Sequence, residues 1–332
     1  MADRDIKAAG APEAQAQVVS PRNKLNELTN REWLRRTKSV WYSGQGEGPE
    51  AAKAAELARK FSRWVAEEEG YEAADELMGQ AFPSVMVSVA PPRDALKVKH
   101  PATFSEVDVA RLITFFTKRG QTVLDPFCGS GSAGVAALEE GRRFVGVELI
   151  SEWHELACAR LCEQTGGRKS ARWAMLLGDA RKQLGVLEPE SVDFVVTSPP
   201  YWNILRKQGI KARVERQELG LATQYSEDDQ DLGNCADYGE FLTRVADILE
   251  LSARALKAGR YMAVIVSDFR EKSRFVLFHS DLAACLEERE LLLQGVTVLV
   301  QDSKGLYPYG VPNAFVPNVH HQYVLILRKP AR

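Results

Sequence analysis

Short apolar runs alternate with amphipathic helical segments along the chain from about residue 100 onward. The runs are rich in Val, Ile, Leu and Phe, as strands buried on both faces of a parallel sheet usually are. The order strand, helix, strand, helix predicts βαβ units joined by right-handed crossovers. The expected helices cover 106–118, 132–141, 151–164, 238–256 and a region near 282–289, and the expected strands cover 122–125, 143–149, 173–180, 191–201, 261–268, 295–301 and 322–328.

The last two expected strands follow one another with no helix between them. Consecutive strands without a crossover pair antiparallel, so these two predict a hairpin at the edge of an otherwise parallel sheet. The sequence therefore predicts an α/β fold with a doubly wound, mostly parallel seven-stranded sheet and an antiparallel edge hairpin.

Three regions differ in composition along the chain. Residues 1–23 combine Ala, Gln, Pro and charged residues without periodicity, which indicates a disordered lead-in. Residues 24–98 are rich in Ala, Glu, Lys and Leu and predict a mostly helical extension, with a short strand or extended linker at 84–92. Residues 99–332 carry the alternating pattern and predict the main domain.

The chain has 332 residues, a formal net charge of -2 and a pI near 6.3. This balance excludes a protein that binds nucleic acid by bulk charge, so such a partner requires a local basic surface. No apolar run reaches the roughly 18 residues of a membrane span, and the N-terminus lacks the apolar core of a signal peptide. We therefore expect a cytoplasmic protein without a membrane partner.

The five cysteines include no CxxC pair, which fits reduced thiols better than a disulfide framework. His154, Cys158 and Cys162 recur at the i, i+4 spacing of a helix, a spacing that metal ligands also use. Because such residues on one helix pack far more often than they bind a metal, no metal site is expected.

The segment DPFCGSGSAG (Asp125 to Gly134) places a G-x-G-x-x-G pattern between an expected strand and a helix. Glu148 ends the next strand, where a carboxylate can accept hydrogen bonds from both hydroxyls of a ribose. One interpretation is a nicotinamide dinucleotide site. An acidic residue at the strand tip, however, suits a pyrophosphate poorly and suits a ligand with an ammonium and a sulfonium group, which favours S-adenosylmethionine. A glycine-rich turn without a ligand is the third interpretation.

A second unusual turn, TSPPYWN (Thr197 to Asn203), follows the apolar run SVDFVV. Proline lacks an N–H, so SPP predicts a rigid turn whose carbonyl groups have fixed directions. The turn lies at the carboxyl end of a strand, where open α/β sheets bind their ligands. Taken alone, it also fits a plain strand end with surface aromatic residues.

Together the two turns resemble the motifs of the amino-group DNA methyltransferases, a family with a Rossmann-like class I methyltransferase fold. DPFCGSG is similar to the family's cofactor motif, DPFxGSG, and TSPPYW is similar to its catalytic motif, in which Asp, Asn or Ser precedes two prolines and an aromatic residue. HPATFS (His100 to Ser105) looks like the motif that closes over the methionine end of the cofactor. The resemblance covers most of residues 25–330. It implies S-adenosylmethionine as cofactor and a binding site formed by His100, Phe104, Asp125, Pro126, Phe127, Gly129, Ser130, Gly131, Glu148, Leu149, Asp179 and Ala180.

The resemblance also implies how the reaction proceeds. The exocyclic amino group of cytosine or adenine is a poor nucleophile, because its lone pair is delocalised into the ring. Ser198 Oγ and the Pro199 carbonyl are expected to accept hydrogen bonds from this group, and Pro200 completes the rigid turn. Tyr201 is expected to stack on a base flipped out of the duplex. Asp179 is expected to accept from the cofactor's adenine amino group, with a helix cap as the alternative.

The cofactor motif precedes the catalytic motif, whereas DPFxGSG is commonest where the catalytic motif comes first, so the motif order is circularly permuted. This order leaves the target-recognition region open. The first candidate is 203–233, whose first half is basic and whose second half is acidic; the alternative is that this segment is a solvated loop. The second candidate is 304–321, which contains aromatic residues, His320 and His321. A weaker third candidate is 51–80. The residues expected to contact DNA are Trp202, Arg206, Lys207, Lys211, Arg213 and Arg216.

The sequence thus predicts a site-specific DNA methyltransferase that acts on an exocyclic amino group. By resemblance, serine in the first position of the catalytic motif favours N4 of cytosine over N6 of adenine. The alternatives are an RNA base-amino methyltransferase, a nicotinamide-dependent oxidoreductase and a binding protein without activity. Double-stranded DNA is the expected partner and a cognate restriction endonuclease a candidate one, with both a monomer and a dimer left open.

Overall fold

The computed structural model describes residues 86–87, 105–167, 170–202, 230–272, 274–301 and 307–331. The chain divides into two compact units, Met1–Trp41 with Lys304–His320 and Tyr42–Ser303 with His321–Arg332. The sheet and the helices named below belong to the second unit. The domain boundaries expected at residues 23 and 98 lie outside the described residues, so they stay predictions.

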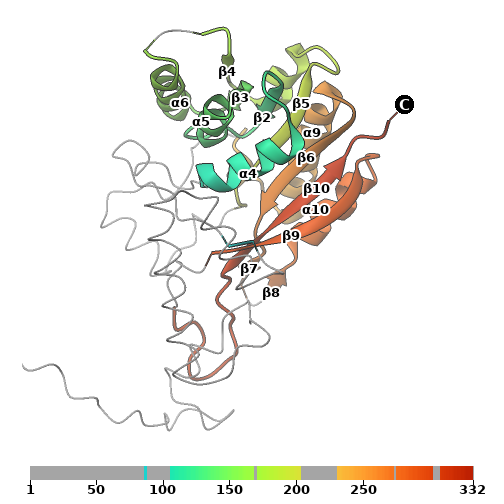
Figure 1. The fold of residues 1–332 in the computed structure, drawn as a ribbon. Coiled ribbons are helices and arrows are strands. Elements are labelled where there is room, and N and C mark those ends of the chain that lie inside the picture. The colour runs from blue at the N-terminus through green and yellow to red at the C-terminus, as the bar shows by residue number, and fades with distance from the viewer. Residues whose placement is uncertain are drawn as a thin grey trace, which may run out of the picture. The chain divides into compact units, whose positions relative to one another are not determined.

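An eight-stranded sheet has the order β1-β9-β10-β6-β5-β2-β3-β4 (Figure 1). Strands β2 to β6 pair parallel, whereas β10 pairs antiparallel with both β6 and β9. The doubly wound α/β fold and the antiparallel pair are confirmed, and the two-residue β1 adds an eighth strand beside β9. The strands are β1 (Met86–Val87), β2 (Thr122–Asp125), β3 (Arg143–Glu148), β4 (Trp173–Leu177), β5 (Val192–Thr197), β6 (Leu256–Val266), β9 (Leu292–Val300) and β10 (His321–Arg328).

Helices cover the two faces of the sheet and enclose two apolar clusters (Figure 1). One cluster packs α4, α5 and α6 against the sheet, and the other packs α9 and α10 against the opposite face. This arrangement follows from the right-handed crossovers, which place successive helices on opposite sides where the strand order reverses. The helices are α4 (Glu106–Phe116), α5 (Ser132–Glu139), α6 (Ser151–Gln164), α7 (Ala180–Gln183), α9 (Tyr238–Ala255) and α10 (Phe278–Glu287).

Strand β6 shows why the strand sequences are continuously apolar. Met262, Val264 and Val266 point into the cluster under α9 and α10. Ala263 and Ile265 point into the cluster under α4 to α6. Successive side chains in a strand alternate between faces, so a strand covered on both sides must be apolar at every position.

Several elements differ from the sequence-based expectation. Strand β6 begins at Leu256 rather than at 261, and α10 begins at Phe278, earlier than expected. A separate hairpin, β7 (Phe269–Glu271) with β8 (Arg274–Val276), was not predicted. Its turn contains Lys272 with a φ of 53° and lacks the Asn-Gly or Asp-Gly pair that marks tight hairpins in a sequence.

Gly146 in β3 lies where a side chain would clash. A Cβ atom built there would lie 2.5 Å from Met175 Sδ and 2.8 Å from Cys128 Sγ. We expect Gly146→Ala to lower the free energy of unfolding by about 1–3 kcal/mol through overpacking, measured by urea denaturation. The matched control is Gly295→Ala in β9, where a Cβ would meet nothing within 4 Å; an equal loss of stability in both variants would contradict the packing argument.

None of the helices in the described ranges is long and apolar enough to cross a membrane. Within the same ranges, no three His, Cys, Asp or Glu side chains are grouped so that they could hold a metal ion. Cys158 Sγ lies 3.8 Å from His154 Nε2 on α6, which is a contact between neighbouring turns of one helix.

Candidate active site

The two unusual turns meet at one edge of the sheet. The glycine-rich loop follows β2, and the Ser198 turn follows β5, the strand that pairs with β2 in parallel. Parallel neighbours present their carboxyl ends at the same edge, so the two turns lie side by side. Thr197, the last residue of β5, connects them directly, because its Oγ1 donates a hydrogen bond of 2.5 Å to Asp125 Oδ1.

The glycine-rich loop is held in one shape by its own backbone. Phe127 N donates to Asp125 Oδ1 at 3.0 Å, and Gly131 N donates to the Cys128 carbonyl at 3.0 Å. Gly129 and Gly131 have φ values of 52° and 82°, in the left-handed region that glycine adopts most readily. The loop therefore enters α5 with its backbone close to the carboxyl edge of the sheet.

Glu148 at the end of β3 fixes the loop from the other side. One carboxylate oxygen accepts from Gly129 N at 2.7 Å and the other from Ile150 N at 2.9 Å. Burial raises the pKa of Glu148, while the backbone hydrogen bonds partly oppose this shift. Each carboxylate oxygen has a second acceptor position, so the group can still accept from a ribose hydroxyl.

An ion pair between two helices supports the same loop. Arg160 of α6 donates to the carbonyl of Ser130 and pairs with Glu106 of α4. Ser132 Oγ also donates to Glu106 Oε1, at 3.3 Å. Sequence reasoning missed both residues of the pair, because an Arg and a Glu on separate helices carry no local signal of their partnership.

Asp125 fits a cationic ligand. Its Oδ2 atom is buried and has no hydrogen-bond partner among the described residues, whereas Oδ1 accepts from Thr197 and Phe127. Burial raises the pKa of Asp125 to about 7. A buried carboxylate oxygen without a partner is costly, and an ammonium group beside it would supply the missing donor. The residues present at β2 therefore fit the amino-acid end of S-adenosylmethionine.

Asp179 caps a short helix, which was the alternative to its cofactor role. Its carboxylate accepts from Arg181 N at 2.9 Å and forms an ion pair with the Arg181 guanidinium, also at 2.9 Å. Burial raises the pKa of Asp179, but the hydrogen bonds and charge of Arg181 outweigh it, so the pKa is lowered. Asp179 and the buried Ala180 follow β4, next to Glu148 on β3, so their predicted place beside the cofactor is kept as a prediction.

The Ser198 turn leaves its serine partly accessible. Ser198 is half-buried, and its hydroxyl makes no hydrogen bond within the described part of the chain. Pro199 is buried and Pro200 half-buried, as expected for a rigid turn. The Tyr201 hydroxyl accepts a hydrogen bond of 3.0 Å from Gln322 Nε2 on β10. Burial raises the pKa of Tyr201 to about 12, so the phenol is neutral at physiological pH.

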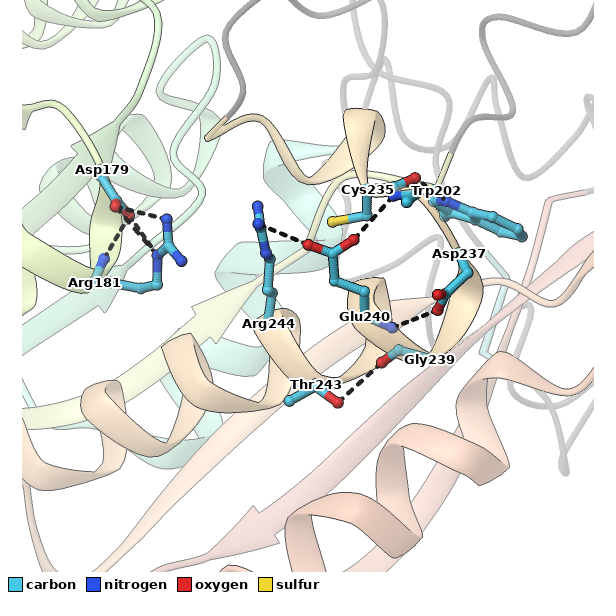
Figure 2. A network of polar contacts seen from close by, with 10 residues as sticks. Asp179, Arg181, Trp202, Cys235, Asp237, Gly239, Glu240, Thr243 and Arg244 are labelled. Atoms are coloured by element: carbon cyan, nitrogen blue, oxygen red, sulfur yellow. Dashed lines mark hydrogen bonds and ion pairs between the residues drawn. The ribbon is translucent and has the colours of Figure 1, made fainter.

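Trp202 is a core residue, which corrects its predicted contact with DNA. Its side chain is only 8% exposed, and its indole N–H donates to the Cys235 carbonyl at 3.0 Å. Figure 2 shows the indole against the segment that leads into α9, where Asp237 caps the helix. Tyr238 and Phe269 pack on the same ring, at centroid distances of 5.9 Å and 6.4 Å. Its role is to anchor the end of the catalytic turn.

A family model described as DNA methylase, for N6 and N4 methyltransferases, matches residues 10–159. This match contains the glycine-rich loop and Glu148 and ends before the Ser198 turn. This likeness extends over less than half of the 332-residue chain. The likeness supports the family expected from the two turns and supports S-adenosylmethionine as the cofactor.

Curated relatives within the family match over a shorter stretch. The type II methyltransferase M2.DpnII of Streptococcus pneumoniae is 44% identical over 63 residues, which are 19% of this chain and 24% of the relative. The DNA adenine methyltransferase YhdJ of Escherichia coli is 39% identical over 62 residues, which are 19% of this chain and 21% of the relative. The chain thus spans about a quarter of the length of the curated relatives that it matches.

Solved structures show weaker likenesses. A SAM-dependent methyltransferase from Methanosarcina mazei has a TM-score of 0.40 and 14% identity, and covers 67% of this chain and 98% of its own. A TehB-like SAM-dependent methyltransferase from Corynebacterium glutamicum has a TM-score of 0.37 and 17% identity, with 67% and 86% of the two chains covered. Scores of this size carry no argument about this chain.

Most of the predicted DNA contacts lie outside the described residues. These are Arg206, Lys207, Lys211, Arg213 and Arg216, and two predicted cofactor contacts, His100 and Phe104, are outside as well. They stay predictions.

Residues 230–233, the described end of the first recognition candidate, are partly buried in the protein. Asp231 is buried, and its carboxylate accepts from Gly233 N at 2.9 Å in a short 3-10 turn. The charge of Asp231 also raises the pKa of Glu148, which places it near the cofactor loop. Asp231 is therefore not part of an acidic surface that repels phosphate, as its place in the acidic half of this candidate suggested.

The second recognition candidate, 304–321, is described from residue 307. Within it, the Tyr307 and Tyr309 rings lie 5.6 Å apart, and Asn318 bonds both the N–H and the carbonyl of Tyr307 at 2.9 Å. These contacts fold the segment onto itself. His321 begins β10, so this residue belongs to the sheet rather than to a loop.

Proposed function

We propose that this protein is a site-specific DNA methyltransferase that transfers a methyl group from S-adenosylmethionine to the exocyclic amino group of a flipped base, with N4 of cytosine favoured. The observation that carries the proposal is the hydrogen bond between Thr197 and Asp125. It links the turn expected to hold the target amino group to the loop expected to hold the methyl donor. A methyl transfer requires these two groups within reach of each other.

The chain's own residues supply positioning and acceptors. S-adenosylmethionine, when bound, supplies an electrophilic methyl group on sulfur. The Ser198 hydroxyl and the Pro199 carbonyl accept from the two N–H bonds of the target amino group, which frees the nitrogen lone pair for attack. The Tyr201 ring stacks on the flipped base and returns roughly 1–3 kcal/mol of the cost of flipping. The target nitrogen would form a bond to the methyl carbon as the carbon–sulfur bond breaks, and the proton that the nitrogen loses would pass to solvent water.

Adenine N6 is the second candidate target. Serine in the catalytic turn supports cytosine N4, whereas the relative YhdJ is a DNA adenine methyltransferase. Both amino groups offer two N–H bonds to the same pair of acceptors, so the turn alone accepts either base. The choice depends on groups that read the rest of the base edge.

The test is a product analysis. The purified protein is incubated with S-adenosylmethionine and unmethylated genomic DNA, and the digested nucleosides are identified by mass spectrometry. We expect N4-methylcytosine. A parallel reaction with S-adenosylhomocysteine in place of the methyl donor is the control and should give no methylated base.

Other products change the proposal in defined ways. N6-methyladenine would keep the transfer to an amino group and overturn the serine argument. DNA without methylated bases, from a preparation shown to bind S-adenosylmethionine, would overturn DNA as the substrate. If the protein then methylated RNA under the same conditions, the transfer to a base amino group would stand and RNA would replace DNA as the substrate.

A further inference from the structure

Two glutamines form a chain of hydrogen bonds that ends at Tyr201, in the turn after β5. Gln301 Nε2 donates to Gln322 Oε1 at 2.9 Å, and Gln322 Nε2 donates to the Tyr201 hydroxyl at 3.0 Å. The three residues come from three segments that are far apart in the sequence: the end of β9, the start of β10 and the turn after β5. No local sequence pattern indicated this connection.

The strand order determines how far the Tyr201 side chain must extend to meet Gln322. β10 is separated from β5 by β6, so the Tyr201 side chain must extend across the carboxyl end of β6 to meet Gln322. Asp268, two residues beyond β6, adds its charge to the causes that raise the pKa of Tyr201. Ser267 Oγ donates to the His321 carbonyl at 3.3 Å and holds the start of β10 against this end of β6. The tyrosine is thus fixed across three strands.

Two amides are a costly way to fill this space. Gln322 is only 9% exposed, and Gln301 Oε1 is buried with no hydrogen-bond partner in the part of the chain that the structure describes. Apolar side chains of similar size would avoid the desolvation of both amides. What the amides provide instead is a directional hydrogen bond to a neutral phenol, which restricts rotation of the ring and its movement toward or away from Ser198.

We propose that Gln322, held in place by Gln301, is a positioning residue that fixes the Tyr201 ring at the depth and angle needed to stack on the target base. This inference rests on the proposed function of the turn. It assigns the glutamines no contact with the base or with the reacting atoms. Their effect is on how often the ring stands where a flipped base can be held for attack.

The kinetic test compares Gln322→Met, Tyr201→Phe and the double variant in single-turnover methylation of DNA. Met keeps the length of Gln and removes the amide. We expect each single change to lower the rate roughly 2- to 12-fold, the scale of one hydrogen bond, with the dissociation constant of S-adenosylmethionine unchanged. The double variant should be no slower than either single one, because both changes remove the same bond. Gln294→Met on the exposed part of β9 is the matched control and should keep the full rate.

A second measurement reads the ring itself. 3-Fluorotyrosine is placed at position 201 by site-specific incorporation, and the fluorine spectrum is recorded on cofactor-bound protein without DNA. We expect one sharp line with Gln322 present and a shifted or exchange-broadened line in Gln322→Met, at temperatures where both proteins are folded. A residue that only fills space would leave the line unchanged.

The outcomes separate the two proposals. A changed fluorine line in a protein that methylates no DNA would overturn the proposed function and show only that Gln322 restrains the Tyr201 ring. Identical fluorine lines in the two proteins would overturn the positioning role, whatever the activity. Rate effects that multiply in the double variant would also overturn it, because independent effects indicate that Gln322 acts elsewhere than through Tyr201.

Discussion

Replacing Asp125 by Asn is expected to stabilise the cofactor-free protein at pH 8 and to weaken S-adenosylmethionine binding at the same time. Burial raises the pKa of this carboxyl to about 7, from its ordinary value of 3.8. The folded state therefore favours the protonated form. At pH 8 the wild-type protein must ionise this group inside the fold, and the amide avoids that cost while its oxygen still accepts from Thr197 and Phe127.

The sign of the pH dependence follows from the raised pKa. The contribution of Asp125 to stability is fully present below pH 3.8 and is lost as the pH rises through about 7. One pKa unit corresponds to about 1.4 kcal/mol, so the loss between pH 5 and pH 7 is about 2 kcal/mol. The difference in unfolding free energy between Asp125→Asn and wild type should grow by this amount over the same interval and level off above it. Urea denaturation of the cofactor-free proteins measures it.

Asp125→Asn is expected to lower the affinity for S-adenosylmethionine, although it raises the stability of the cofactor-free protein. Calorimetry should show S-adenosylmethionine bound roughly 10- to 100-fold more weakly by Asp125→Asn, since a hydrogen bond to a charged group contributes about 1.5–3 kcal/mol. Asp193→Asn is the matched control at the other edge of the sheet, where Asp193 pairs with Lys257 at 2.7 Å and accepts from Thr122 N at 3.0 Å. It should lower stability and leave binding unchanged. If Asp125→Asn binds S-adenosylmethionine as tightly as the wild-type protein does, Asp125 is not part of the cofactor-binding site.

Replacing Ser198 by Ala is expected to lower the single-turnover rate of methyl transfer by roughly 100-fold, the scale of removing one positioned hydrogen-bonding group at a reacting centre. The Ser198 hydroxyl makes no hydrogen bond within the described ranges, so its loss should cost little stability. Affinity for S-adenosylmethionine should stay within about twofold, because Asp125 and Glu148 hold the cofactor loop without Ser198.

Ser191→Ala at the opposite end of β5 is the control for this change. Ser191 is exposed, and its hydroxyl donates to the Glu188 carbonyl at 2.7 Å, away from the carboxyl edge. It should retain the wild-type rate. If Ser198→Ala instead loses cofactor binding and rate together, the serine belongs to the cofactor site, and the division of roles between the two turns is wrong.

The alternation of apolar strands and amphipathic helices was enough to predict the doubly wound sheet. A strand covered on both faces must be apolar throughout, so β5 and β6 are visible as continuous runs. The two turns of the site could also be predicted from the sequence, because Gly129 and Gly131 adopt positive φ values and the two prolines fix a turn at a strand end. Such local constraints act over a few residues and leave their mark in the sequence.

The sequence could not show which side chains meet across the sheet. Trp202 beside Tyr201 looked like a second base-facing aromatic, yet it packs under the start of α9. Its direction depends on neighbours that lie more than thirty positions away, such as Cys235, whose carbonyl accepts from the indole.

By itself, then, the sequence determined the fold class and the two turns of the site, because period, glycine and proline act locally. Only the tertiary structure decided how those turns are joined and held. Thr197 bonds Asp125 because β5 lies beside β2, and Gln322 reaches Tyr201 because β10 is inserted antiparallel next to β6. Strand order brings these atoms within 3 Å of each other, and strand order is settled by burial of the whole sheet rather than by any short stretch of residues.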